Sequence, residues 1–173
     1  MERFGKSRWL AVVLTVVAFA WMLLIFAFSA QPDTESSEIS GHVSYQLVSG
    51  WNEAFQLEMT GEELQEEALR IEFPVRKAAH MGEYAVLACL VFGAFTGWKN
   101  AGVRSFSNRR KCFIWSAQVA FLYACSDEFH QLYVPGRAGR ITDVLIDTTG
   151  AVGGLLIVFV VTYWYNQYKK RKR

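Results

Sequence analysis

The chain has 173 residues, of which 52% are apolar, and its formal net charge is only +2. Two stretches carry no charged side chain, Trp9–Phe28 and Thr148–Tyr168, and each has the length of ~20 residues that crosses a hydrocarbon layer. This segregation of charge excludes a soluble enzyme, a disordered chain and a disulfide-stapled secreted module. The three cysteines are widely spaced in apolar stretches and indicate neither a disulfide framework nor a zinc site.

The first apolar run predicts a transmembrane helix at about residues 9–29. A basic segment precedes it, and the small residues Ala27, Ser29 and Ala30 near its end would suit a signal peptidase. The run is longer than the ~7–15 residues of a signal-peptide core. We therefore expect an anchor that the protein retains.

Residues 30–76 form the long extracytoplasmic loop that we expect after this span. Thr60 and Glu63 match a capping box that begins a short helix, and Pro74 is expected to end that helix before the next span. The first half of the loop predicts another short helix, which lies in the membrane interface on its aromatic side. Its apolar residues recur at helical spacing: Ile39, Val43, Leu47, Val48, Trp51 and Phe55. A solvated acidic loop that covers the bundle is the alternative interpretation.

Three further spans are expected at about residues 77–98, 112–133 and 143–166. The predicted fold is therefore an all-α integral membrane bundle of four transmembrane helices, in one domain that covers residues 1–173. Of the 18 Lys and Arg residues, 13 fall in the N-terminus, the middle loop and the C-terminal tail. The positive-inside rule then places both termini in the cytoplasm. The basic tail directly follows a span, so we expect it to meet anionic lipid and not nucleic acid.

Polar and charged residues gather at the outer ends of the last three spans. Each ionisable group at membrane depth costs ~2.5–3.5 kcal/mol on insertion scales, so such groups are candidates for a functional site. Helix geometry places Lys77, His80 and Tyr84 within about 60° of one another, with Glu83 beside His80. The candidate cluster consists of Lys77, His80, Glu83, Asp127, Glu128, His130, Gln131 and Asp143.

The third and fourth spans each direct these groups to one face. Tyr123, Asp127, His130 and Gln131 share a face of about 100°, with Glu128 off its edge. On the fourth span, one stripe within about 60° contains Asp143, Asp147, Gly150 and Gly154. Its small residues predict close approach of another helix.

A short segment joins the last two spans and contains two candidate ligand-binding residues, Arg137 and Arg140. Pro135, Gly136 and Gly139 predict a tight turn. This turn presents both guanidinium groups beside the carboxylates. The planar fork of arginine suits a carboxylate or phosphate group, since it can donate two parallel hydrogen bonds.

Residues 127–154, with the KAAHMGEY stretch at 77–84, resemble the VanZ-like family of small bacterial membrane proteins. The resemblance implies a multi-pass protein of the bacterial cell membrane, in a family named after an accessory protein of teicoplanin-type glycopeptide resistance. Asp147 departs from the family pattern, which often has Asn there. The matching positions are Phe28, Ser29 and Gln31; Lys77, His80 and Tyr84; Asp127, Glu128 and Gln131; Pro135, Gly136 and Arg137; and Asp143.

The favoured functional interpretation is a site for an amphiphilic anionic molecule at the outer membrane boundary. Membrane lipids, a lipid-linked envelope intermediate or a lipoglycopeptide are the expected partners, with Arg137, Arg140 and Lys77 at the head group. For chemistry, His80 or His130 beside Glu83 or Glu128 would act as general base. The sequence names no nucleophile, so catalysis stays open, and no cofactor is expected.

Three alternatives remain. In the first, the charged residues only hold the helices together. In the second, the protein is a small proton-coupled transporter, but the sequence lacks the inverted repeat that is typical of such proteins. A metal site is the least supported, because the sequence has no HExxH pair. The oligomeric state stays open.

Overall fold

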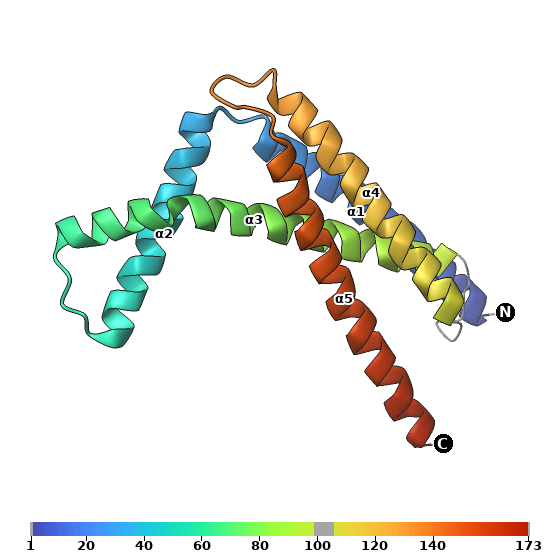
Figure 1. Cartoon of the computed structure of the whole chain (residues 1–173). Coiled ribbons are helices and arrows are strands. Elements are labelled where there is room, and N and C mark those ends of the chain that lie inside the picture. The colour runs from blue at the N-terminus through green and yellow to red at the C-terminus, as the bar shows by residue number, and fades with distance from the viewer. Residues whose placement is uncertain (1, 99–105, 173) are drawn as a thin grey trace.

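The computed structural model describes residues 2–98 and 106–172, and the elements of this part of the chain are all helices (Figure 1). The expected all-α fold is therefore confirmed. In chain order the helices are α1 (Glu2–Ser29), α2 (Asp33–Phe55), α3 (Gly61–Trp98), α4 (Phe106–Gln131) and α5 (Ile141–Arg171).

Helix α3 is the centre of the structure, because it packs against α1, α2, α4 and α5 and crosses the middle of the molecule in Figure 1. Its buried side chains recur at three- and four-residue spacing, which defines one apolar face. Small and apolar side chains from three other helices complete the core around that face. The core includes Tyr84, Leu87, Ala88, Val91 and Phe92 of α3, Ala18 and Ile25 of α1, Ala120 and Ala124 of α4, and Ala151 and Leu155 of α5.

Helix α2 pairs with the first half of α3, and the two project together from the other helices (Figure 1). Polar contacts join them: the Ser40 hydroxyl donates to Glu72 at 2.8 Å, and Arg76 donates to the Ser37 hydroxyl at 2.6 Å. The capping box is confirmed, since the Thr60 amide donates to the Glu63 carboxylate at 2.7 Å and the Glu63 amide to the Thr60 hydroxyl at 3.3 Å. Both parts of the loop are thus helical as expected, but α2 is a helix of 23 residues and not a short one.

The expectation that Pro74 ends a helix is wrong, because α3 runs without a break from Gly61 to Trp98 with Pro74 inside it. A proline in a helix lacks one backbone hydrogen bond, at a cost of about 3 kcal/mol. Here Glu72 and Arg76, on either side of Pro74, are both held by side chains of α2. These contacts keep the two halves of α3 on one surface, so the second loop helix and the second span are one helix.

Three helices of the described chain are long and apolar enough to cross a membrane, at Arg8–Ser29, Gly61–Trp98 and Ile141–Lys169. The fourth span, expected at about residues 112–133, is not confirmed. Only 15 residues separate Lys111 from Asp127, so the uncharged part of α4 is short. Helix α4 nevertheless packs against α1, α3 and α5.

The contact between α3 and α5 depends on two glycines. A Cβ atom at Gly150 would lie 2.3 Å from the carbonyl oxygen of Met81, and one at Gly154 would lie 2.9 Å from that of Ala85. Both distances are shorter than a real Cβ contact, so only glycine allows this approach. The predicted small-residue contact is therefore confirmed, with α3 as the partner.

At the opposite end of α4 from the acidic pair 127–128, Arg109 is inserted between α4 and α5. Its guanidinium stacks on the Phe159 ring at 4.7 Å and donates to the Phe159 carbonyl at 3.1 Å and to the Thr162 hydroxyl. The side chain is buried. A residue that the sequence analysis counted only as a basic loop charge therefore fastens two helices together.

Replacing Gly150 with alanine is expected to lower the stability of the fold. The added Cβ would meet backbone atoms that have no rotamer to change, and overpacking of this kind costs about 1–3 kcal/mol. Gly153→Ala is the matched control, because nothing lies within 4 Å of its added Cβ and alanine favours a helix. Thermal unfolding in detergent checks this, and equal midpoints for the two variants would contradict the close approach.

Arg109→Ala is expected to destabilise the protein more than Arg110→Ala. Hydrogen bonds from a charged donor contribute about 1.5–3 kcal/mol each, and Arg109 makes two in a buried position, whereas Arg110 is exposed. The measurement is the unfolding midpoint of both variants by tryptophan fluorescence. Similar midpoints would mean that Arg109 does not fasten α4 to α5.

Candidate functional site

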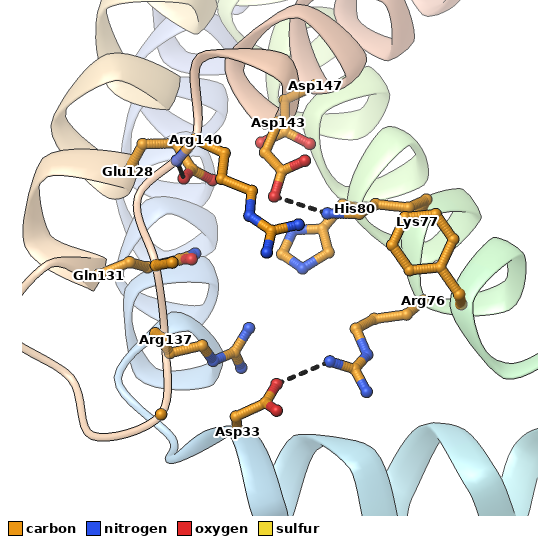
Figure 2. A pocket seen from close by; sticks show the side chains of 13 residues that line it. Asp33, Arg76, Lys77, His80, Glu128, Gln131, Arg137, Arg140, Asp143 and Asp147 are labelled. Atoms are coloured by element: carbon orange, nitrogen blue, oxygen red, sulfur yellow. Dashed lines mark hydrogen bonds and ion pairs between the residues drawn. The ribbon is translucent and has the colours of Figure 1, made fainter.

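A polar cavity of about 230 Å³ lies where the start of α2, the middle of α3, the end of α4 and the start of α5 meet (Figure 2). The turn between α4 and α5 forms one of its walls. Seven of the ten candidate residues named from the sequence line it. The full lining is Asp33, Phe73, Arg76, Lys77, His80, Glu128, Gln131, Gly136, Arg137, Ala138, Arg140, Asp143 and Asp147.

An ion pair between α3 and α5 forms one side of the cavity. Lys77 Nζ lies 2.7 Å from Asp143 Oδ2, and both side chains are largely buried. The same ammonium lies 5.4 Å from the centre of the Phe73 ring. One turn further along α3, His80 Nδ1 lies 4.0 Å from Glu83 Oε2. Lys77 and Asp143 therefore neutralise each other.

Arg76 is a site residue that the sequence analysis counted only as an outer charge. Its guanidinium donates to Asp33 Oδ1 at 2.8 Å and also pairs with Glu72. Both Arg76 and Asp33 line the cavity. The spacing of four residues between Glu72 and Arg76 was the available signal, since it favours an ion pair on one helix face. The contact with Asp33 depends on how α2 folds back.

The turn between α4 and α5 is fixed against the junction of α1 and α2. The Asp33 amide donates to the Pro135 carbonyl at 3.3 Å, and Arg137 Nε donates to the Gln31 carbonyl at 3.2 Å. Gly136 between them has a φ of +76°, and a Cβ there would lie 3.2 Å from that of Asp33. Glycine is suited to this left-handed conformation and to the close contact.

Arg140 directs its side chain into the cavity from the start of α5 (Figure 2). Its backbone amide donates to Glu128 Oε2 at 2.7 Å, but its guanidinium makes no hydrogen bond or ion pair within the described residues. Arg137 likewise has no carboxylate partner there, because it bonds only to a carbonyl oxygen. Among the described residues, these two guanidinium groups are therefore the arginines of the cavity that form no ion pair.

Glu128, one of the candidate residues, lines the polar cavity although it lies off the edge of the face that Asp127 and His130 share. It is 6% exposed and accepts the hydrogen bond from the amide that precedes α5. A carboxylate is favoured at the positive end of a helix. The polar residues of α4 thus contact two neighbours, since Glu128 bonds to the start of α5 whereas His130 and Gln131 contact α1.

His130 and Asp127, also on α4, do not line either cavity described here. The His130 ring lies 4.4 Å from that of Phe26, on α1. Asp127 is buried and accepts a long hydrogen bond of 3.4 Å from Gln131, which also donates to the Ser29 hydroxyl at 3.0 Å. These contacts join the ends of α1 and α4.

A second cavity of about 200 Å³ lies beside the polar one, between α2, α3 and the end of α1. Its exposed lining is mainly apolar. Glu83, the remaining candidate from α3, lines it. Its other lining residues are Phe28, Gln31, Ser36, Ile39, Ser40, Val43, Val75 and Ala79, with Arg76, His80 and Arg137 shared between the two cavities.

Asp147 lies at the deep end of the polar cavity. The side chain is 2% exposed, and its Oδ2 atom has no hydrogen-bond partner. The sequence places Asp147 on the stripe of the fourth span with Asp143, Gly150 and Gly154, but it was not among the ten candidate residues. Within residues 2–98 and 106–172, no three His, Cys, Asp or Glu side chains are grouped so that they could hold a metal ion.

The comparisons with known proteins give a family match. A family model described as VanZ/LLP1 matches residues 14–162, a range that contains every residue lining the two cavities. No curated protein and no solved structure matches the chain. The family match extends over most of the chain and covers all of the apolar helix Gly61–Trp98 and most of Arg8–Ser29 and Ile141–Lys169. The chain therefore belongs to the VanZ/LLP1 family and is a membrane protein.

Proposed function

We propose that this protein binds an amphiphilic molecule that carries a phosphate or carboxylate group, such as a lipid or a lipid-linked envelope intermediate. The observation that carries the proposal is the pair of adjacent cavities, one polar and one mainly apolar, with Arg76, His80 and Arg137 as their common wall. An amphiphile has the same two parts, joined at one point.

The unpaired guanidinium groups are the evidence that the ligand carries an anionic group. Lys77 and Arg76 already have carboxylate partners, so their charge is used within the protein. Arg137 and Arg140 are left, and arginine can bind a phosphate or carboxylate through two parallel hydrogen bonds. Such a group would lie between the two side chains, in the open centre of Figure 2.

The apolar cavity is the evidence that the ligand carries a hydrocarbon chain. Ile39 and Val43 line it and are also exposed on α2, so its apolar surface continues to the outside of the molecule. Trp51 and Phe55, nearer the C-terminal end of α2, are exposed as well. A helix with such a face lies in the membrane interface, and a lipid chain would then reach the cavity from the bilayer.

We further propose that α4 completes a bundle of four spans with both termini in the cytoplasm. This orientation puts the polar cavity at the outer face of the cell membrane. A lipid-linked envelope intermediate or a lipoglycopeptide would be accessible there, and a site for either would suit a family linked by its name to teicoplanin resistance.

The second candidate function is that of helix attachment. The ion pairs Lys77–Asp143 and Arg76–Asp33 join different helices, as a purely structural polar cluster would. Arg140 takes part in neither pair. A substitution of Arg140 therefore tests ligand binding while both ion pairs stay intact.

Arg140→Ala is expected to weaken binding of a polyprenyl monophosphate about tenfold or more, because a charge-assisted contact contributes about 1.5–3 kcal/mol. Arg137→Ala is expected to weaken it similarly. The measurement is a titration of the purified protein by native mass spectrometry. Arg70→Ala is the matched control, since Arg70 pairs with Glu66 and Glu67 on an exposed face of α3. Equal affinity in all the variants would leave the charges as helix attachments.

The orientation has its own test. A reporter fused after Arg173 is expected to lie in the cytoplasm, and a reporter inserted near Glu62 is expected to lie outside it. The reason is that 13 of the 18 basic residues fall on the side of the membrane that holds the two termini, and the positive-inside rule makes that side cytoplasmic. An extracytoplasmic C-terminus would overturn both the orientation and the fourth span.

A further inference from the structure

The cavity contains a carboxylate that the protein itself does not use. Asp147 is 2% exposed, lines the polar cavity and has an oxygen without a hydrogen-bond partner. A buried polar atom without a partner is rare and costly in a folded protein, and a buried charge needs a counter-charge. Lys77, a cation of α3 that lines the same cavity, already forms an ion pair with Asp143 at 2.7 Å. A positively charged group from outside the chain would supply the partner that Asp147 lacks.

The unpaired groups of the cavity have opposite charges and lie at different ends. In Figure 2 the carboxylates of Asp143 and Asp147 lie together at one end, the guanidinium of Arg137 lies at the other, and that of Arg140 lies between. Arg137, Arg140 and Asp147 thus line one and the same cavity. A ligand that satisfies both kinds of group must carry a negative and a positive group.

The charge balance of the lining leads to the same ligand. The lining contains four Arg or Lys side chains and four Asp or Glu side chains. With all of these groups ionised, a ligand with a single negative charge would give the cavity a net negative charge, whereas a zwitterion would keep it neutral. Because uncompensated charge is costly away from water, a zwitterion is the better match.

We propose that the polar cavity binds a phosphate diester that carries a primary ammonium group, the head group of a phosphoethanolamine lipid. The phosphate lies on Arg137 and Arg140, and the ammonium donates hydrogen bonds to Asp147. This inference rests on the proposed function and names the ligand class of the same site. An ammonium with three N–H donors suits a carboxylate with an unpartnered oxygen better than a quaternary amine, which has none.

The experiment compares two short-chain lipids that differ only in the ammonium, dioctanoyl phosphatidylethanolamine and dioctanoyl phosphatidylethanol. Titration of each into the purified full chain, followed by native mass spectrometry, gives the ratio of their affinities. In the wild type we expect the ethanolamine lipid to bind about tenfold more tightly, as for one charge-assisted hydrogen bond. Equal affinities in the wild type would overturn the inference.

Asp147→Asn is expected to reduce this ratio to about twofold or less, because the amide keeps the shape of the side chain and removes its charge. Glu66→Gln is the control, since it makes the same chemical change on an exposed face outside both cavities, and it is expected to keep the wild-type ratio. An unchanged ratio in Asp147→Asn would overturn the role of Asp147. Should that variant fail to fold, the wild-type ratio decides.

The outcomes also separate this inference from the proposed function. If both lipids bind equally and both lose affinity in Arg140→Ala, the phosphate site stands and the ammonium site is overturned. If neither lipid binds but polyprenyl monophosphate does, this inference is overturned and the proposed function stands; if none of the three binds, both are overturned. A third arm uses soluble glycerophosphoethanolamine, which has the same head group without acyl chains. Much weaker binding of this compound supports a lipid ligand, and equal binding would overturn the role of the apolar cavity.

Discussion

The approach of α5 to α3 at Gly150 is the constraint on which the site depends. At this point the backbone of Met81 lies where a side chain at position 150 would be. Lys77 lies one turn before Met81, and Asp143 lies two turns before Gly150, so the two helices meet again at these charges and form an ion pair of 2.7 Å. Asp147, between Asp143 and Gly150, is buried by the same approach.

A second set of contacts closes the cavity from the other side. Gln131 donates to Ser29, Arg137 donates to Gln31, and the Asp33 amide donates to Pro135. Each contact joins the junction of α1 and α2 to the end of α4 or to the following turn. Apolar helices gain little from burial within lipid, where close packing and hydrogen bonds provide the attraction. Polar contacts of this kind therefore fix where the turn and its two arginines lie.

Several features of the site could be predicted from the sequence because they depend on local geometry. The capping box at Thr60 and the stripe of Asp143, Asp147, Gly150 and Gly154 depend only on residues within a few turns of one helix, and both are present. Other features depend on partners far away in the chain. Pro74 was expected to end a helix, and neither the role of Arg76 nor the insertion of Arg109 between α4 and α5 was foreseen.

The sequence by itself determined that the chain is helical, that it carries apolar spans and that its polar residues gather at one end of them, because helix periodicity and hydrophobic length act along a single segment. The tertiary structure alone decided which charges pair. Lys77 and Asp143 form an ion pair. Arg137 and Arg140 form none within the described residues, and Asp147 has an oxygen without a hydrogen-bond partner. Pairing depends on the angle and depth at which helices pack, and these follow from contacts between residues that are distant in the sequence.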